Sequence, residues 1–576
     1  MQQAEHRWDL SALFKDNTQL DKALVRLKKN AQAYEKRYAH KLDQLPIADT
    51  LKAIEGYEGI IEEISKAMTY VFLVFAADTT QGDFYAKYEL SINAIQEHIV
   101  FFELEFCSLE AQKQKEWIKH ATKYAYFLQN LIAKKSHQLS LGEEKVLLAT
   151  SPVGVGAFSR LFDEYLSSLK IPHNSKELSE EEILALLHHH DRKTRKKAQK
   201  SFSKVLEKSS FLLTYIFNMV RKDLHIQTKL RHFKNKESFR HIDNQITQKS
   251  VDSMIEIVNA HFPLVHRYYA LKSKLLSHQL KDYDRYAPIA QSGNGVSYEE
   301  SLEWVLKAFK EFSPMFFEIA QKAIKNGWID SHPRDGKRGG AFSHGAVPSA
   351  HPYVLLNFTG NRRDAFTIAH EFGHMIHQEL SKQRGCLNMD TPLTTAETAS
   401  VFAEMLLFES LKKNLCPKEL RAIYASKLED IFSTLFRQVV MTNFERRIHQ
   451  AEGELKTCDF DKIWREENQK MFGESLKLTK NYSRWWSYIP HFIHSPFYCY
   501  AYSYGQLLVL ALFGLYQSSQ NKDFVAVYTD FLSKGGSQSP RDLVGAFGFD
   551  IEDSAFWKIG IQEVERMLLE FENLEV

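Results

Sequence analysis

The chain has 576 residues, of which 44% are hydrophobic and 25% charged, so it can bury two or three cores or one large helical enclosure. Its formal net charge is +2, which gives no reason to expect nucleic acid or an anionic membrane as a partner. The five cysteines are scattered and form no C-x-x-C pair, so we expect free thiols in a reducing compartment.

The N-terminal stretch shows no secretory signal, because MQQAEHRWDLSALF lacks a basic segment followed by an apolar one. The longest apolar runs, residues 71–77 and 507–516, have about ten residues or fewer, and a membrane-spanning helix needs about 20. We therefore expect a soluble, cytoplasmic protein that spans no membrane.

Helices are expected over most of the N-terminal third. Residues 21–135 are rich in Ala, Leu, Glu, Lys and Gln, with apolar residues at helical spacing and Pro46 as the only proline. This pattern predicts long antiparallel helices. Proline and glycine interrupt it at residues 150–158, TSPVGVGAF, and helices resume through Leu213. The segment HHHDRKTRKKAQK, residues 188–200, is interpreted as the solvated face of a helix because its charge run is short.

One stretch is marked as non-helical. Residues 335–360, DGKRGGAFSHGAVPSAHPYVLLNFTG, contain five glycines and two prolines. The run PYVLLNF within it, residues 352–358, is bounded by turn residues on both sides, which is typical of a strand. We expect no other stretch of this kind, apart from the short break at residues 150–158.

A helix with a histidine motif follows this strand. Residues 362–383, RRDAFTIAHEFGHMIHQELSKQ, have apolar residues at helical spacing, and Asp364 can cap the helix. His370 and His374 are four residues apart, so they stack on one face and can bind one zinc ion. His377 lies two turns from His370, too far for three ligands on one straight helix to converge, so we expect it to neighbour the site. Position 377 is not the glycine with which a metzincin turns toward a third histidine, so the third ligand must come from elsewhere.

A second helix offers that ligand. Residues 394–413, TTAETASVFAEMLLFESLKK, predict an amphipathic helix on which Glu397 and Glu404 are seven residues apart and share one face. Two carboxylates flanked by apolar residues are costly unless they bind something. We therefore favour Glu397 as a metal ligand over a surface carboxylate. Glu404 is then the acceptor for the N–H of a ligating histidine.

These motifs resemble those of the oligoendopeptidase F family and, more distantly, of thimet oligopeptidase, which are zinc peptidases of one superfamily. The resemblance is carried by PYVLLNFTGNRRDAFTIAHEFGHMIH, by the spacing to ETASVFAE and by HFIHSPFYCYAYSYG near the C-terminus. It covers roughly residues 151–576, whereas the first 150 residues are similar only in being helical. The resemblance implies one zinc ion per chain bound by His370, His374 and Glu397, with Glu371 as the general base.

The aromatic segment near the C-terminus receives its roles from the same resemblance. Residues 485–506, WWSYIPHFIHSPFYCYAYSYGQ, contain two histidines and five tyrosines. His491 and Tyr498 are implied to bind the substrate carbonyl and stabilise the transition state, and Tyr502 is a weaker candidate. His494 departs from the family pattern and is left unassigned.

The fold implied by the resemblance is mainly α, a large helical body enclosing a deep substrate cavity with a small β-sheet beside the H-E-x-x-H helix. We place an N-terminal helical domain at residues 1–190 and a zinc peptidase catalytic domain at residues 191–576. If the strand at residues 351–358 lies at a sheet edge, it can pair an extended peptide. Gly339 and Gly340 would then allow close approach of the substrate backbone.

The leading hypothesis is a cytoplasmic zinc metalloendopeptidase that hydrolyses peptide bonds in short, unstructured oligopeptides. A metal-activated water would attack the carbonyl, and Glu371 would accept its proton. Two alternatives stay open. The first is a metallocarboxypeptidase, which differs in where it cuts a defined peptide. The second is a non-catalytic peptide-binding protein, against which the intact Glu371 argues. The sequence predicts no particular oligomeric state.

Overall fold

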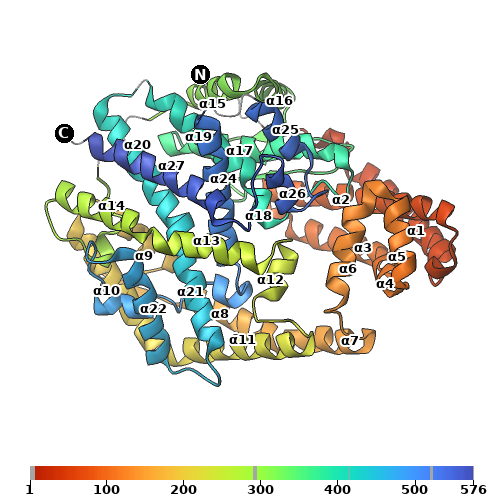
Figure 1. Cartoon of the computed structure of the whole chain (residues 1–576), viewed down its shortest axis with the longest axis horizontal. Helices are drawn as coiled ribbons and strands as arrows, with labels where there is room; N and C mark the ends of the chain where they lie inside the picture. Colours follow the sequence, from red (N-terminus) through yellow and green to blue (C-terminus); the bar gives the residue numbers. More distant parts are fainter. Residues whose placement is uncertain (1–6, 290–294, 414, 519–522, 575–576) are drawn as a thin grey trace. The chain divides into compact units, whose positions relative to one another are not determined.

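The computed structural model describes residues 7–289, 295–413, 415–518 and 523–574 (Figure 1). Helices account for 72% of the chain, which confirms the predicted mainly-α class. The chain divides into two compact units, each assembled from three separate segments. Unit 1 consists of segments 1–135, 293–414 and 515–549, and unit 2 of segments 136–292, 415–514 and 550–576. The domain boundary expected at residue 190 stays a prediction.

The first segment of unit 1 is a succession of helices. They are α1 (Asn17–Tyr38), α2 (Ile47–Ala77), α3 (Gly82–Gln96), α4 (Phe101–Ser108), α5 (Ala111–His120) and α6 (Ala125–Lys135). Leu20, Leu24, Leu27 and Ala31 recur at helical spacing along α1 and are buried in the core that α1 shares with α2. Pro46 stands directly before the first residue of α2, where the absence of its N–H costs nothing. The helices predicted between residues 21 and 135 are confirmed.

The other helices of unit 1 belong to its second and third segments. They are α15 (Tyr298–Phe312), α16 (Pro314–Lys325), α17 (Arg362–Ser381), α18 (Leu393–Ala396), α19 (Thr398–Lys412), α25 (Phe524–Ser533) and α26 (Pro540–Gly545). Helix α17 contacts α15, α19, α25 and the sheet, so it lies at the centre of this unit. The α17 N-cap is Asn361, and Asp364 completes a capping box by accepting a hydrogen bond from the Asn361 N–H. The predicted capping role of Asp364 is therefore shared with Asn361.

The sheet of unit 1 has the order β3-β5-β4, with β3 at Ile329–Asp330, β4 at Phe342–His344 and β5 at Tyr353–Leu355. Strand β5 runs parallel to β3 and antiparallel to β4, with Val354 opposite both Ile329 and Ser343. The strand expected in PYVLLNF is thus present, and the sheet lies beside α17 as predicted. However, β5 is the central strand and not an edge. Its continuous apolar run is typical of a strand that is buried on both faces.

Unit 2 is also helical. Its helices are α7 (Leu141–Thr150), α8 (Val155–Ser168), α9 (Glu180–Ala185), α10 (Arg192–Lys208), α11 (Ser210–Leu230), α12 (Ser238–Asp243), α13 (Gln248–Ala260), α14 (Phe262–Leu275), α20 (Pro417–Ile431), α21 (Arg437–Gln450), α22 (Thr457–Phe472), α23 (His491–His494), most of α24 (Cys499–Gln517) and α27 (Ser554–Asn573). The break expected at residues 150–158 is present, because a 3-10 turn at Ser151–Val153 separates α7 from α8.

A β-hairpin in unit 2 was not predicted. Strand β1 (Ile171–His173) pairs antiparallel with β2 (Lys176–Leu178), so residues 335–360 are not the only stretch with strands. The two loop residues, Asn174 and Ser175, have φ angles of 48° and 65°. A two-residue loop with both φ angles positive matches the twist of a hairpin, and asparagine tolerates that conformation well. The strands are too short for their alternation to be recognised in the sequence.

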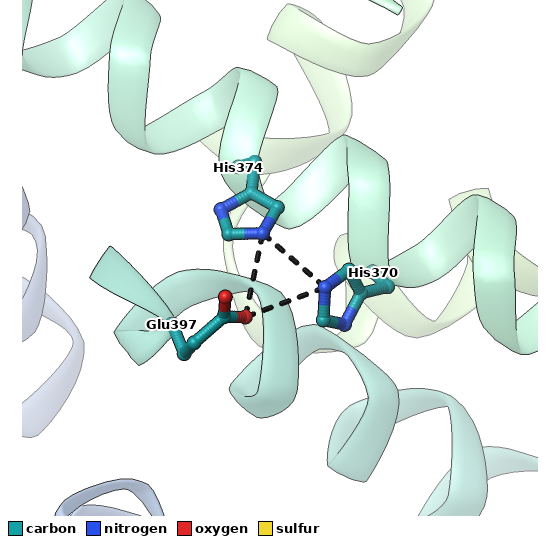
Figure 2. A group of neighbouring side chains, drawn as sticks. All are labelled: His370, His374 and Glu397. Atoms are coloured by element: carbon teal, nitrogen blue, oxygen red, sulfur yellow. Dashed lines mark hydrogen bonds and ion pairs between the residues drawn. The ribbon is translucent and has the colours of Figure 1, made fainter. Parts of the chain in front are cut away.

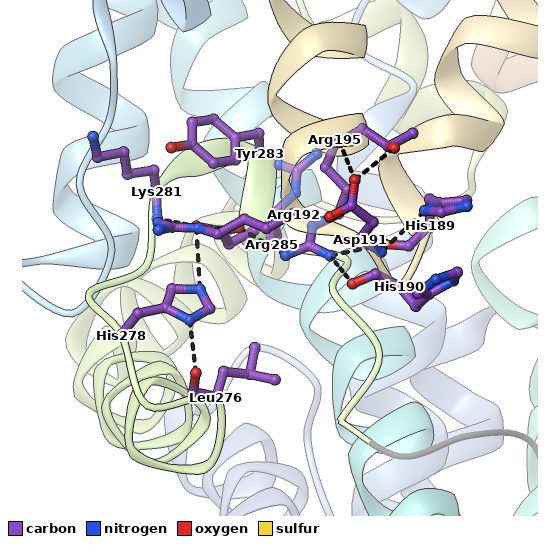
Figure 3. A network of polar contacts seen from close by, with 12 residues as sticks. His189, His190, Asp191, Arg192, Arg195, Leu276, His278, Lys281, Tyr283 and Arg285 are labelled. Atoms are coloured by element: carbon purple, nitrogen blue, oxygen red, sulfur yellow. Dashed lines mark hydrogen bonds and ion pairs between the residues drawn. The ribbon is translucent and has the colours of Figure 1, made fainter.

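The interpretation of residues 188–200 as a solvated helix face is partly wrong. The lysines of this segment are exposed, but Arg195 and Gln199 are each only 2% exposed. Arg192 and Arg195, which are labelled in Figure 3, both bind the buried carboxylate of Asp284, at 2.8 and 2.9 Å. Helical spacing places Arg195 and Gln199 on the inner face of α10, together with Phe202.

Helix α24 has the length and apolar character of a membrane span, and it alone has both in the described part of the chain. It contains 19 residues with a mean hydropathy of 1.2, and 78% of its apolar window is buried inside the protein. Core helices pass the same test of length and hydropathy, so this is weak evidence for a membrane span.

Candidate metal centre

Two histidines of α17 and the glutamate that precedes α19 bring three ligand atoms together in unit 1 (Figure 2). The Nε2 atoms of His370 and His374 are 3.2 Å apart. The Oε2 atom of Glu397 is 3.3 Å from the first nitrogen and 3.4 Å from the second. A single ion could therefore contact all three side chains at once.

The spacing of these atoms fits a small tetrahedral ion. Zinc binds histidine nitrogen and carboxylate oxygen at about 2.0–2.2 Å, and tetrahedral bonds of about 2.0–2.1 Å put neighbouring ligand atoms about 3.3–3.4 Å apart. The three separations in the cluster, 3.2, 3.3 and 3.4 Å, agree with that edge length. Two imidazoles and one carboxylate are also a donor set of catalytic zinc sites, which keep a fourth position open.

A second glutamate of α19 orients one of the histidines. The Oε1 atom of Glu404 lies 2.6 Å from Nδ1 of His370. A carboxylate at that distance accepts the N–H of the ring, so the proton of a neutral His370 lies on Nδ1 and the lone pair on Nε2. Ser400 similarly donates its hydroxyl to Oε2 of Glu397 at 2.7 Å. Both contacts hold ligand atoms toward the centre of the cluster.

The electrostatics of the cluster favour a bound cation. Burial on its own would lower the pKa of His370, but the hydrogen bond and charge of Glu404, with the charge of Glu397, raise it to about 9. Burial would raise the pKa of Glu397, but the two histidines and Ser400 lower it to about 2. The carboxylates thus attract positive charge to this point, which a divalent ion supplies as well as a proton does.

Two backbone features position Glu397. The predicted continuous helix over residues 394–413 is instead broken, because α18 ends at Ala396 and Glu397 precedes the first residue of α19. In addition, α17 and α19 pack very closely at Gly373. A Cβ atom there would lie 2.5 Å from the carbonyl oxygen of Ala399 and 2.6 Å from Cα of Ser400. The glycine in HEFGH therefore permits the approach that brings Glu397 to the histidines.

Glu371 lies next to His370 in the same helix. Its side chain is only 6% exposed. Burial raises the pKa of its carboxyl group, and the opposing effect of His370 and His374 is smaller. A carboxylate with a raised pKa is a better proton acceptor at neutral pH than an exposed one.

The sequence matches the model of a peptidase family over most of its length. The model described as "Peptidase family M3" matches residues 185–563. The chain belongs to peptidase family M3. A second model, described as "Oligopeptidase F", matches residues 105–171 of this M3 peptidase. The enzyme is accordingly a metalloendopeptidase, as the sequence resemblance implied.

Curated relatives of this M3 peptidase are similar over nearly the whole chain. Oligopeptidase PepF of Bacillus subtilis is 28% identical over 99% of this chain and 87% of its own length. The oligoendopeptidase F homolog of Borreliella burgdorferi is 28% identical over 97% of this chain and 98% of its own length.

Solved structures share the fold. A crystal structure of a protein from Chlamydophila abortus, described as a peptidase, superimposes with a TM-score of 0.88 at 23% identity and covers 99% of this chain and 98% of its own. Oligoendopeptidase F from Enterococcus faecium gives a TM-score of 0.71 at 22% identity, with coverage of 97% and 99%. Both likenesses support the large helical fold.

The third histidine of the stretch HEFGHMIH, His377, is not part of the ligand cluster. The cluster consists of His370, His374 and Glu397. Burial lowers the pKa of His377 to about 3, so its imidazole is neutral at physiological pH. It is a buried residue one turn beyond His374 on α17.

The predicted substrate-binding residues of the M3 peptidase near its C-terminus lie in unit 2. Nε2 of His491 is 3.3 Å from the hydroxyl of Tyr502, and the Tyr498 and Tyr502 rings meet edge to face with centroids 5.0 Å apart. The three side chains form one cluster, and their roles toward the substrate stay predictions. His494, left unassigned, binds Asp163 through Nε2 at 2.8 Å.

Glu445 and Arg240, which the sequence analysis did not identify, hold the loop that carries Tyr498. Phe497, directly before it, has a φ of 57°, which is strained for a residue other than glycine. Its N–H donates to Glu445 at 2.8 Å, and Arg240 donates to the carbonyl of Pro496 at 3.2 Å. Burial raises the pKa of Glu445 to about 8. No local spacing signals these contacts, because Glu445 and Phe497 are 52 residues apart.

The predicted glycines of the loop before β4 lie in unit 1. Gly340 has a φ of 81°, and a Cβ atom at Gly339 or Gly340 would meet nothing within 4 Å. Asn357 holds the turn by donating to the carbonyl of Gly340 at 2.7 Å. The backbone there is open to an approaching chain, and the role of these glycines in substrate binding stays a prediction.

Proposed function

We propose that this M3 peptidase is a zinc endopeptidase that hydrolyses bonds within short, unstructured oligopeptides. The observation that carries the proposal is the triangle of His370, His374 and Glu397, whose edges fit a tetrahedral zinc ion. A zinc ion held there would lower the pKa of a water molecule and polarise the scissile carbonyl. We further propose a cytoplasmic location, which the free state of all five cysteines supports.

The proton is moved by Glu371 in this proposal. Its buried carboxylate takes a proton from the attacking water and later delivers it to the leaving amine. Glu404 keeps the ring of His370 oriented by accepting its Nδ1–H. His370 thereby keeps one tautomer throughout the reaction.

Substrate binding is assigned to the predicted residues in this proposal. The hydroxyl of Tyr498 and the imidazole of His491 donate hydrogen bonds to the carbonyl oxygen as negative charge develops on it. Tyr502 contacts the substrate as well. In unit 1 the edge strand β4, with the open turn at Gly339 and Gly340, offers backbone groups to an extended peptide.

The domain limits are part of the same proposal. Residues 191–576 would form the catalytic domain, since they contain every residue assigned to catalysis. The family model, which begins at residue 185, supports this limit. Residues 1–190 would form the helical domain, and a deep cavity would restrict the enzyme to short peptides.

The experiment compares two variants in which a glutamate of α17 is replaced by the uncharged glutamine. Glu371→Gln keeps the shape of the side chain and the three ligands, so we expect about one zinc ion per chain but a loss of about 10²–10⁴-fold in hydrolysis. Glu379→Gln, on the same helix and paired with Lys322 and Lys382, should retain wild-type activity. Zinc content is measured by elemental analysis, and cleavage by mass spectrometry of a mixed peptide library.

The same library separates the competing functions. Internal cleavage supports an endopeptidase, whereas removal of C-terminal residues alone would indicate a carboxypeptidase. Peptide binding without cleavage by the zinc-loaded wild type would indicate a binding protein. Activity of Glu371→Gln within a few-fold of wild type would contradict its role as the base.

A further inference from the structure

Two guanidinium groups in unit 2 converge on one phenol oxygen. Arg285 is 5% exposed and donates to the hydroxyl of Tyr286 at 2.8 Å and to that of Tyr482 at 3.1 Å. Arg437, the first residue of α21, donates to the same Tyr286 hydroxyl at 3.4 Å. Two positive charges are thus held around a neutral group.

Among the described residues, neither guanidinium forms an ion pair with a carboxylate. The neighbouring acids are bound by other groups. Asp284 binds Arg192 and Arg195. Asp282 accepts from Gln199 and Thr479, and Glu429 accepts from Lys272 and Tyr268. In the described part of the chain, no carboxylate therefore lies within ion-pair distance of Arg285 or Arg437, although Asp282 is near enough for the charge of Arg285 to act on its pKa.

Hydrogen-bond donors of both arginines are also unused. The Nε atoms of Arg285 and Arg437 are buried and have no partner. A buried charge without a paired counter-ion is unfavourable, and a buried donor without an acceptor adds to that cost. An anion with more than one oxygen, or a halide, would relieve both costs at once.

The place is accessible from solvent. Arg437, Tyr286 and Tyr488 are partly exposed, whereas Arg285 is buried. His188 stacks on the ring of Tyr286 with centroids 4.5 Å apart, so the phenol is held in place. Burial would raise the pKa of Tyr286, but the two guanidinium groups outweigh it and lower this pKa.

We propose that Arg285, Arg437 and the hydroxyl of Tyr286 form a binding site for one small anionic group. Its chemistry suits a carboxylate or an inorganic anion such as chloride, since arginine forks and a phenol O–H are donors to either. The anion has two sources. It is a free ion of the solution, or it is a carboxylate of the peptide; the second source rests on the proposed function.

The first measurement needs no catalysis. Chloride is titrated into the zinc-loaded protein in a zwitterionic buffer that contains no other small anion, while the thermal midpoint is followed. A site that binds chloride in the native state raises the midpoint in a saturable manner. We expect this rise in the wild type and not in Arg437→Gln. The control, Arg267→Gln, removes an arginine that already pairs with Glu565 and Glu572, and should keep the rise.

The second measurement identifies the peptide as source. Two peptides of the same sequence, one with a free and one with an amidated C-terminus, are hydrolysed at saturating chloride and without it. If the site binds the peptide carboxylate, kcat/KM for the free acid exceeds that for the amide by about ten- to a hundredfold, as for one hydrogen bond to a charged group. Arg437→Gln should bring the two values together, and Arg267→Gln should not.

The two measurements distinguish the two sources of the anion, and they can also contradict the proposed site. A chloride response that depends on Arg437 supports a free ion, and an acid-to-amide ratio that depends on Arg437 supports the peptide carboxylate. If neither quantity depends on Arg437, the proposal is wrong. A tyrosinate absorbance at neutral pH that disappears in Tyr286→Phe would also overturn it, because the phenolate would then balance the charge.

Two further variants keep the test decisive if Arg437→Gln fails to fold. Arg437→Lys keeps the charge and removes the fork, and Tyr286→Phe keeps the ring and removes the hydroxyl. Each should weaken the chloride response, and an undiminished response in both would overturn the site. If the enzyme cleaved no peptide at all, the proposed function would fail while the thermal measurement still tested the anion site.

Discussion

The orientation of His370 depends on one carboxylate of the neighbouring helix. Glu404 lies 2.6 Å from Nδ1, and this contact leaves Nε2 facing His374 and Glu397. Partners of this kind are needed because a free imidazole rotates and has two tautomers. The metal affinity of the cluster should therefore depend on a residue that does not touch the ion.

We expect Glu404→Ala to weaken zinc binding by about 10–100-fold, as is usual when the partner of a ligating histidine is lost. Competition with a chelator of known affinity measures the effect. Glu409→Ala removes another glutamate of α19, one that pairs with Lys412, and should leave the affinity unchanged. Equal zinc affinity in Glu404→Ala and the wild type would show that the Nδ1 contact has no part in metal binding.

Contacts between residues that are close in the sequence can be predicted from their spacing, whereas contacts between distant segments cannot. His370 and His374 could be placed on one face because four residues make about one helical turn. By contrast, Arg437 meets Tyr286 across 151 residues, and no periodicity connects them. Residues whose partners come from distant segments therefore escaped the sequence analysis.

At the scale of elements, the site depends on how closely α17 and α19 pack. Helix α17 could be predicted because it is long, capped and regularly periodic. The break before α19 could not, because a one-residue distortion at Glu397 barely changes the apolar pattern. The contact at Gly373 was also hidden, since a glycine within a helix signals neither its neighbour nor its purpose.

We expect Gly373→Ala to destabilise the protein, although alanine is the better helix former by about 0.8–1.0 kcal/mol. The added Cβ would lie 2.5 Å from the carbonyl of Ala399, and such overpacking costs about 1–3 kcal/mol. Separation of the helices should also lower zinc affinity. Denaturant unfolding and chelator competition measure the two effects.

The matched control is Gly59→Ala, in the interior of α2, where a Cβ would meet nothing within 4 Å. There only the helix propensity acts, so a gain of about 0.5–1 kcal/mol in the free energy of unfolding is expected. If Gly373→Ala were stabilised by the same amount as Gly59→Ala, α17 and α19 could accommodate the added methyl group, and their close contact would not depend on the glycine.

At the scale of the whole molecule, the chain alternates between the two compact units and crosses between them five times, once within α24. The three residues of the metal cluster nevertheless belong to one segment of unit 1, and all three lie between residues 370 and 397. A bound ion therefore ties α17 to the start of α19, and its direct effect on stability should be confined to unit 1.

Removal of the metal tests whether the stabilising effect of the ion is confined to unit 1. A ligand that binds only the native state stabilises it by mass action, and local opening is suppressed most where the ligand is bound. After chelation we expect amide hydrogens of α17, α18 and α19 to exchange faster, while those of α21 and α22 in unit 2 keep their rates. Hydrogen exchange followed by mass spectrometry gives the rates for each helix.

In Glu397→Ala, which lacks one ligand, the chelator should change these rates little. Equal acceleration in both units would mean that they open as one cooperative body, and no acceleration in α17 or α19 would mean that the ion is bound elsewhere.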